Sequence, residues 1–479
     1  MTKLTLSSIL IFLFFILPFL VTTQTTTNPN NEQTILLGFK QHWSNPSSLD
    51  DWKQSTDQCK WSGITCTNGL VTKLEIINGT ITETIPPTIC DLKNLTYIDL
   101  QWNFIPGPFP TVLYNCFNLE HLDLSENYFT GPIPNDINRL SPHLQYLNLA
   151  VNNFTGDIPA TIGSFQKLTS LQLVQNLFDG SFPPEIGNLS NLEELVMNYN
   201  AFTPQPIPFS FTKLTKLKKL WMTEANLIGE IPNGIGNMLA LESIDLSYNN
   251  LTGTIPDSLF LLPNLAILYL YYNQLSGSIP QTVEALKLQI IDLSNNTLTG
   301  TIPDDFGKLK NLTGLALFSN RLSGPIPTSI ATLTELVDVG LWSNNFSGEL
   351  PPDFGLHSPL KTFQVCLNQF VGELPKNLCK NNALIGLIAF DNKLAGQLPG
   401  SDLGNCSSLI IIRVEDNMLS GEVPAELGRL PNLGFLDLSR NAFQGKIPSV
   451  FENAKFNRSF LNNSGLCSDF ESLGLKKCV

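Results

Sequence analysis

Histidine and basic residues are scarce in this sequence. Its 479 residues include four histidines, which lie far apart at His42, His121, His143 and His357. No Ser-His-Asp set, carboxylate pair or metal-ligand spacing recurs around them, so we expect no catalysis, no metal site and no cofactor. Lys and Arg number 28 against 41 Asp and Glu, which gives a net charge of −13. Phosphate binding needs clustered basic residues, so nucleic acid is not an expected partner.

Long apolar runs are equally rare. The one such run extends from Ile9 to Val21, after Lys3 and before small polar residues that begin at Thr22. This layout predicts a secretory signal peptide over residues 1–23. A membrane anchor is the alternative, but the run is short for a span. No later segment holds eighteen consecutive apolar residues, so we expect no membrane span in the mature chain.

Glycosylation sequons are numerous by contrast. Together with a signal peptide they predict a glycosylated extracellular protein. The eleven Asn-x-Ser/Thr sequons begin at Asn78, Asn94, Asn153, Asn188, Asn250, Asn295, Asn311, Asn345, Asn405, Asn457 and Asn462.

Most of the chain is a repeat. The stretch from Leu265 to Pro280 reads LAILYLYYNQLSGSIP, and copies follow at Leu288 to Pro303 and at Leu312 to Pro327. The shared pattern is L-x-x-L-x-L-x-x-N-x-L-x-G-x-I-P. A period in the twenties with this pattern predicts an α/β leucine-rich-repeat solenoid with a parallel inner sheet. The Asn slot marks sixteen repeats, 23 to 25 residues apart, at Gly79, Asn103, Asn127, Asn152, Asn176, Asn200, Ala225, Asn249, Asn273, Asn296, Asn320, Asn344, Asn368, Asn392, Asn417 and Asn441.

Each slot of the repeat has a physical role. The L-x-L core predicts a short strand whose leucines are buried only by stacking on neighbouring repeats. The Asn amide is expected to bond backbone groups of its own turn and of the adjacent repeat. Repeats are predicted over residues 71–449, with an N-terminal cap over residues 24–70 and a C-terminal cap over residues 450–479. A short amphipathic helix is expected from Glu32 to His42 in the first cap.

The nine cysteines fit an oxidising compartment. Stacking places Cys90 beside Cys116 and Cys379 beside Cys406 on the outer side of consecutive repeats. One cysteine, Cys366, is left over; it is either an inert small side chain or a reactive thiol. The predicted disulfides are Cys59–Cys66, Cys90–Cys116, Cys379–Cys406 and Cys467–Cys478.

Several motifs resemble those of one receptor family. The L-x-G-x-I-P repeats, the W-S-G-I-T-C cap motif ending at Cys66 and the G-L-C motif ending at Cys467 are similar to the ectodomains of plant leucine-rich-repeat receptor kinases. The outer cysteine pairs and the segment LWMTEANLIGEIP, from Leu220 to Pro232, resemble the HAESA-like group of peptide receptors. No glycine-rich loop, catalytic Asp or DFG motif is present, so we expect an ectodomain that is not an enzyme.

The resemblance implies a function. Such receptors bind secreted peptides along the inner surface and then recruit a co-receptor kinase of the somatic-embryogenesis type near the C-terminal repeats. It also implies a monomer before ligand binding, at the outer face of the plasma membrane or soluble in the apoplast. A secreted inhibitor of a pathogen's cell-wall-degrading enzyme is the alternative function. A co-receptor is a third possibility, but co-receptor ectodomains of this type are much shorter.

One motif of the family is incomplete. Many members carry two arginines, one residue apart on a late strand, that hold the carboxylate of the peptide. The equivalent stretch LIIIRVEDN has Arg413 at the second position and Ile411 at the first, with Glu415 and Asp416 close by. We therefore expect a looped peptide, or one with a different ending.

Variable slots of the later repeats carry the candidate site. Tyr and Trp most often supply binding energy at interfaces, although packing between neighbouring side chains is the alternative reading. Small residues among the aromatics, such as Gly314, Gly340 and Gly386, are expected to let a peptide backbone approach. The acidic balance favours a basic peptide. The predicted peptide-binding residues are Trp221, Tyr248, Tyr269, Tyr271, Phe318, Trp342, Phe390 and Arg413.

Overall fold

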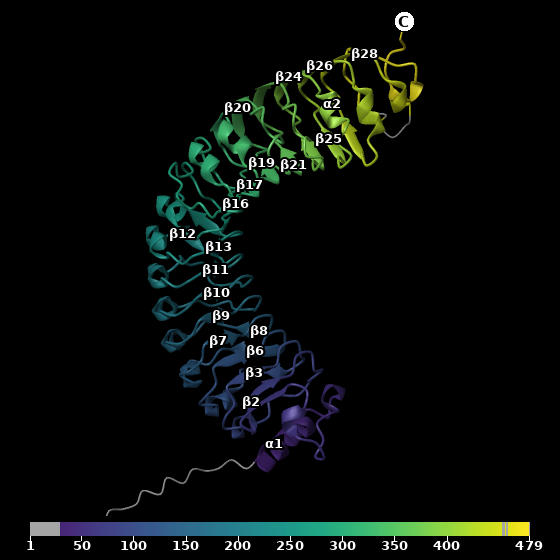
Figure 1. Cartoon of the computed structure of the whole chain (residues 1–479). Coiled ribbons are helices and arrows are strands. Elements are labelled where there is room, and N and C mark those ends of the chain that lie inside the picture. The colour runs from purple at the N-terminus through teal and green to yellow at the C-terminus, as the bar shows by residue number, and fades with distance from the viewer. Residues whose placement is uncertain (1–28, 453–455, 457, 479) are drawn as a thin grey trace, which may run out of the picture.

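The computed structural model describes residues 29–452, 456 and 458–478. The predicted signal peptide and the sequon at Asn457 lie outside the described residues. The chain forms a curved solenoid, with α1 at one end and the C-terminus at the other (Figure 1). The leucine-rich-repeat fold expected from the sequence is confirmed.

The N-terminal end is closed by a helix and a hairpin. Helix α1, Pro29–His42, begins three residues before the predicted start. Strand β1, Ile64–Thr67, pairs antiparallel with β2, Leu70–Glu75. Trp52 and Trp61 are buried and stack with centroids 5.4 Å apart. These large apolar side chains cover the open face of the first repeat.

The inner face is one sheet of 17 strands. After the β1–β2 hairpin all its pairings are parallel, and each strand is three residues long because the chain turns out of the sheet after every L-x-L core. The strands after β2 are β3 Tyr97–Asp99, β5 His121–Asp123, β7 Tyr146–Asn148, β9 Ser170–Gln172, β10 Glu194–Val196, β11 Lys219–Trp221, β13 Ser243–Asp245, β15 Ile267–Tyr269, β16 Ile290–Asp292, β17 Gly314–Ala316, β19 Asp338–Gly340, β21 Thr362–Gln364, β23 Gly386–Ile388, β25 Ile411–Arg413 and β27 Phe435–Asp437.

Shorter sheets and helical turns complete each repeat. The remaining strands are β4 Pro106–Gly107, β6 Tyr128–Pro132, β8 Asn153–Thr155, β12 Ile228–Glu230, β14 Asn250–Thr252, β18 Ser323–Gly324, β20 Asn345–Glu349, β22 Gln369–Gly372, β24 Lys393–Gln397, β26 Met418–Gly421, β28 Ala442–Lys446 and β29 Gly465–Cys467. Helix α2 is Gly400–Leu403. The 3-10 helices are Ser47–Leu49, Gln58–Lys60, Ile89–Asp91, Thr111–Asn115, Ile137–Arg139, Ala160–Ser164, Pro184–Asn188, Phe209–Lys213, Asn233–Asn237, Asp257–Leu261, Asp304–Lys308, Thr328–Thr332, Ala425–Arg429, Ser449–Phe451 and Glu471–Leu473.

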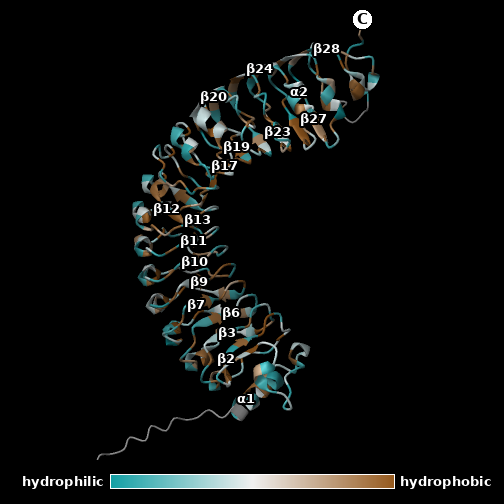
Figure 2. Ribbon diagram, viewed as in Figure 1, coloured by the Kyte–Doolittle hydropathy of each residue, from teal (hydrophilic) through white to brown (hydrophobic). Residues whose placement is uncertain are grey.

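Stacked apolar side chains run through the interior. Hydrophobic and hydrophilic segments alternate along the ribbon around the whole arc (Figure 2). Phe129, Phe154, Phe178 and Phe202 form a stack with successive centroids 6.0 to 6.3 Å apart. Each ring is at most 1% exposed, so neighbouring repeats bury one another's aromatic surface.

The asparagine slot bonds adjacent repeats as predicted. The amide nitrogen of Asn249 donates to the carbonyls of Met222, Leu246 and Ser247 at 2.9 to 3.0 Å. Its Oδ1 accepts from the backbone N–H groups of Ala225 and Leu227. Because these backbone groups are buried, the side chain supplies the partners that water cannot.

The Ala225 slot offers a test of this ladder. Ala225 is fully buried in a turn where neighbouring repeats have Asn. Ala225→Asn is expected to raise the free energy of unfolding by about 1 kcal/mol, because the added amide can bond turn backbone on both sides. Gly79→Asn is the opposite case, since a Cβ at Gly79 would lie 2.5 Å from Cγ2 of Ile76. Denaturant titration of both variants measures the change in the free energy of unfolding. If Ala225→Asn destabilised the protein as much as Gly79→Asn, the expected stabilisation by the added amide would be contradicted.

Four disulfides join the pairs expected from the sequence. They are Cys59–Cys66, Cys90–Cys116, Cys379–Cys406 and Cys467–Cys478. Cys366 is buried and unpaired. Burial raises the pKa of its thiol to about 12, so the thiol is protonated at neutral pH. This favours the inert reading of Cys366, because the thiolate is the reactive form.

The described residues contain the repeats and the segments that flank them, without a catalytic domain. In this part of the chain, no helix combines the length and the apolar character that a membrane crossing requires.

Candidate functional site

The eight predicted peptide-binding residues fall into four groups along the inner sheet. Trp221 lies on β11, three tyrosines lie on or after β13 and β15, Phe318 and Trp342 form a pair, and Phe390 lies beside Arg413. The strand register aligns Trp221 with Asp245 and Asp245 with Tyr269. Strands are about 4.8 Å apart, so six steps of the sheet place Tyr269 roughly 29 Å from Arg413. The groups therefore form a track and not a single pocket.

Tyr248, Tyr269, Tyr271 and Tyr272 form the tyrosine cluster. Tyr248 and Tyr272 stack with centroids 4.6 Å apart and are each 48% exposed. Tyr271 meets Tyr248 edge-on at 5.3 Å and Tyr269 edge-on at 5.8 Å. The backbones of Tyr248 and Tyr272 are left-handed, with φ of 53° and 52°. This turn carries both rings out of the strand, so the cluster presents an open aromatic surface.

Acidic groups lie beside the tyrosines, since Asp245 and Asp292 are the register partners of Tyr269 on the two neighbouring strands. Burial, and then the charges of Asp245 and Asp292, raise the pKa of Tyr269. Burial also raises the pKa of Tyr271. Asp292 accepts from the N–H and the hydroxyl of Ser294 at 3.0 and 2.6 Å, but burial still raises its pKa. Aromatic rings next to carboxylates favour a cationic side chain as the ligand group.

Trp221 is half-buried and already bonded. Its Nε1 donates to Oγ of Ser243 at 2.8 Å, and Nζ of Lys219 lies 4.8 Å from its ring centroid. One face of the indole is therefore covered by a lysine of its own strand. This contact leaves Trp221 less available than the tyrosine cluster.

Phe318 and Trp342 stack on each other with centroids 4.5 Å apart and planes at 8°. A Cβ added at Gly340 would lie 3.3 Å from Cδ1 of Phe318. The Phe318 ring thus lies close to Gly340, and close approach of a peptide backbone at this glycine stays a prediction. At Gly386 an added Cβ would meet nothing within 4 Å, so room remains there.

Phe390, Arg413 and Glu415 form the arginine site. The guanidinium carbon of Arg413 lies 4.1 Å from the Phe390 centroid and 5.9 Å from that of Phe435. Nε of Arg413 donates to Oε1 of Glu415 at 2.9 Å, and Nη2 donates to the same oxygen. The Glu415 side chain is 2% exposed, and burial raises its pKa although Arg413 lowers it. The one family-motif arginine is therefore paired internally.

Tyr272 belongs to the Y-L-Y-Y run that marks this repeat in the sequence, and it completes the tyrosine cluster. One further residue, Phe435, joins the site without having been expected from the sequence. The Phe435 ring centroid lies 5.9 Å from the guanidinium carbon of Arg413. Its sequence signal is an aromatic residue two positions after the first Leu of its repeat, and the structure leaves that ring exposed.

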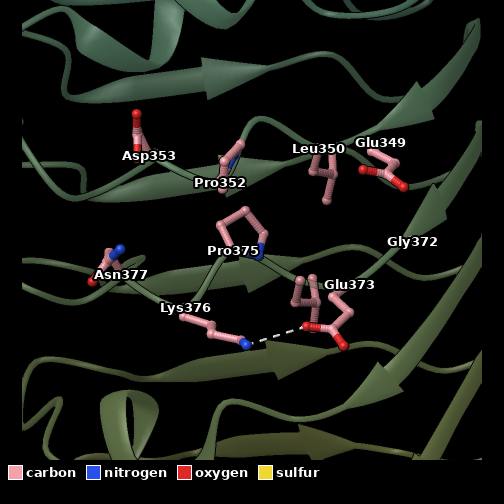
Figure 3. A pocket seen from close by; sticks show the side chains of 10 residues that line it. Glu349, Leu350, Pro352, Asp353, Gly372, Glu373, Pro375, Lys376 and Asn377 are labelled. Atoms are coloured by element: carbon pink, nitrogen blue, oxygen red, sulfur yellow. Dashed lines mark ion pairs between the residues drawn. The ribbon is translucent and has the colours of Figure 1, made fainter.

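A separate hollow lies away from the inner sheet. It is lined by residues such as Glu349, Glu373 and Lys376 at the ends of β20 and β22 (Figure 3). Its ion pair, Glu373 with Lys376 at 3.5 Å, is exposed. Exposed ion pairs contribute little to stability. None of the predicted peptide-binding residues lines this hollow.

Comparison with known proteins decides the family. Residues 29–67 match the leucine rich repeat N-terminal domain family. The Arabidopsis receptor kinase HAESA, crystallised with the peptide hormone IDA and the co-receptor SERK1, is 36% identical with a TM-score of 0.85. The match covers 92% of this chain and 74% of that chain. This chain belongs to the plant leucine-rich-repeat receptor family. The Leucine Rich Repeat family matches residues 118–140, 143–165, 240–262, 264–286, 287–309 and 432–454.

Other family members match parts of the chain. The plant peptide hormone receptor RGFR1, solved in complex with RGF2, has a TM-score of 0.74 at 33% identity over 82% of this chain and 62% of that chain. Receptor-like protein 52 of Arabidopsis thaliana is 50% identical over 260 residues. That match covers 53% of this chain and 31% of the relative, so the chain spans about a third of this curated relative. Extracellular receptor relatives and four disulfides fit passage through the secretory pathway.

Proposed function

We propose that this chain binds a secreted peptide across the inner surface of its later repeats and, with the peptide bound, recruits a co-receptor kinase of the somatic-embryogenesis type. The observation that carries the proposal is the tyrosine cluster, an open aromatic surface on the concave sheet. Exposed aromatic groups of this size on a soluble protein commonly mark a binding surface. The HAESA structure supports the same use, because it contains a peptide hormone and a co-receptor.

The charges around the site favour one ligand chemistry. Asp245 and Asp292 occupy the same register row as Tyr269, one on each side of it. The peptide is therefore one that places a lysine or arginine over the tyrosine cluster. The arginine site does not offer a free cation for a C-terminal carboxylate, since Arg413 is paired with Glu415.

Calorimetric titration of the glycosylated protein tests the proposal. The titrant is a panel of secreted plant peptides, each with a version in which Lys and Arg are replaced by Gln. We expect one peptide to bind with micromolar or tighter affinity. Its Gln version is expected to bind at least about tenfold more weakly, which corresponds to a loss of about 1.4 kcal/mol of binding free energy. Absence of binding across the panel, with capture of a fungal polygalacturonase in a pull-down, would instead support the inhibitor function.

Eight of the ten described sequon asparagines are exposed, and Asn94 and Asn295 are half-buried. Glycosylation at these positions stays a prediction. Protein expressed with its glycans is therefore the form to titrate.

A double substitution tests the reading of the arginine site. Strand β25 pairs with β27, and the residue that corresponds to Glu415 in the next repeat is Ser439. Ile411→Arg with Glu415→Ser would release Arg413 and place a second cation beside it. We expect this variant to prefer the peptide acid over the peptide amide by about tenfold, since a charged hydrogen bond contributes about 1.5 to 3 kcal/mol.

The natural chain is the control for that comparison. It is expected to bind the acid and amide forms of the peptide about equally, and Arg413→Ala is expected to retain its affinity. If the natural chain already preferred the peptide with a free carboxylate, Arg413 would have to leave Glu415 when the peptide binds. That result would contradict the proposal that Arg413 stays paired with Glu415.

A further inference from the structure

A second cluster of functional groups lies on the inner surface of the early repeats, far from the tyrosine cluster. Asp99 ends β3, and His121 and Asp123 lie at the two ends of β5. Tyr97 pairs with His121 and Asp99 pairs with Asp123 across these parallel strands. One ring nitrogen of His121 and one carboxylate oxygen of each Asp lie within 4.8 Å of one another. The stacking of repeats thus unites residues that are more than twenty positions apart.

The imidazole of His121 is held between two tyrosine rings. Its centroid lies 3.9 Å from that of Tyr97 and 4.2 Å from that of Tyr146, with planes at 6° and 4°. The Nε2 atom is buried and has no hydrogen-bond partner among the described residues. Burial lowers the pKa of His121 to about 4.

Negative charge is concentrated around this ring. Glu75, Asp99 and Asp123 occupy one register row across β2, β3 and β5. Nζ of Lys73 lies 2.8 Å from Oε1 of Glu75 and compensates the charge of that carboxylate. The carboxylates of Asp99 and Asp123 have no lysine or arginine paired with them among the described residues. Asp99 and Asp123 are only 3% and 4% exposed. Burial, together with the charges of Asp123 and Glu75, raises the pKa of Asp99, although bonds from Gln101 oppose the shift.

Neighbouring groups orient both carboxylates. Oδ1 of Asp99 accepts from the N–H of Gln101 at 3.1 Å. Asp123 accepts four bonds. Its Oδ1 accepts from the N–H and the hydroxyl of Ser125 at 2.9 and 2.6 Å, and its Oδ2 accepts from Nδ2 of Asn148 at 2.8 Å and from the Tyr146 hydroxyl at 3.4 Å. A carboxylate has about four acceptor positions, so Asp99 has capacity for a metal ion, whereas at Asp123 the ion would replace the long bond from Tyr146. Such supporting bonds are usual around metal ligands.

We propose that Asp99, His121 and Asp123 bind one divalent transition-metal ion of the zinc type. An imidazole nitrogen with two carboxylates suits zinc, cobalt or nickel, whereas calcium and magnesium prefer oxygen ligands alone. Three protein ligands leave at least one coordination position for water or for a ligand group. The four histidines are far apart in the sequence, which predicted no metal site, but strand stacking brings carboxylates of adjacent repeats beside His121.

Titration of the full chain with zinc chloride at pH 7.5 tests the site. We expect one ion per chain, and a cobalt complex whose visible absorption reports nitrogen and oxygen ligands. His121→Phe preserves an aromatic ring between Tyr97 and Tyr146 while it removes both nitrogens, and it is expected to weaken zinc binding by at least about tenfold. Asp99→Asn keeps the size of that side chain and is expected to weaken binding similarly.

His143→Phe is the matched control, because His143 is exposed and contacts Lys167 on another part of the surface. It is expected to bind zinc as the natural chain does. Absence of binding to the natural chain, or equal binding by His121→Phe and the natural chain, would overturn the proposal. If His121→Phe does not fold by circular dichroism, Asp99→Asn decides the question in the same way.

Discussion

Asn249→Ala is expected to lower the free energy of unfolding by about 3 to 5 kcal/mol. The substitution removes five hydrogen bonds, to three carbonyls and from two N–H groups. The N–H groups of Ala225 and Leu227 and the carbonyl of Met222 would remain buried without this partner. Each unsatisfied buried group costs about 1 to 3 kcal/mol. Because each repeat contacts only its neighbours, the loss is expected to be local, between β11 and β15.

Hydrogen exchange and urea titration together measure this effect. Faster exchange is expected for the amides around Ala225 and Leu227, with little change near either end. Asn264→Ala is the matched control in the same repeat, since its amide makes only exposed bonds, to the Leu239 carbonyl and from Nζ of Lys287. Asn249→Asp keeps the shape and the acceptor but loses the donated bonds. A stable Asn249→Asp variant would show that packing, and not hydrogen bonding, explains the asparagine slot.

The regular slots of the repeat are what made the fold predictable. The L-x-L core, the Asn slot and the outer cysteines recur at a constant period, so local pattern and stacking specify the same structure. The bonds of Asn249 and the pairing of Cys90 with Cys116 follow directly from that period. Signal-peptide cleavage and glycosylation stay predictions, because they depend on events that the folded chain does not record.

The candidate site was less predictable because each of its side chains can contact several different neighbours. The sequence indicated which residues face inward, but not that Phe318 would lie close to Gly340. The sequence placed Glu415 near Arg413 but did not show whether the two side chains would form an ion pair. His121 seemed isolated along the chain, yet the register sets it between Tyr97 and Tyr146. Period-based reasoning predicts positions, whereas contacts depend on rotamers and on packing across strands.

Tyr271→Ala is expected to weaken peptide binding by at least about tenfold and up to about a hundredfold, on the proposed peptide-binding function. Tyr271 lies at the centre of the tyrosine cluster, with edge contacts to Tyr248, Tyr269 and Tyr272. Central aromatic residues commonly contribute about 2 kcal/mol or more to an interface. The substitution also removes support from the stacked Tyr248–Tyr272 pair, so the whole surface should lose its shape. Calorimetric titration with the peptide found in the panel measures the change.

Tyr199→Ala is the matched control for this loss. Tyr199 is 50% exposed, and its left-handed backbone matches those of Tyr248 and Tyr272, but it lies near β10, outside the cluster. It is expected to leave the affinity unchanged. Tyr271→Phe separates the ring from the hydroxyl and should retain most of the binding, because the ring supplies the contact area. A peptide that binds the natural chain and Tyr271→Ala equally, with both proteins folded, would move the binding surface away from the tyrosine cluster and toward the arginine site.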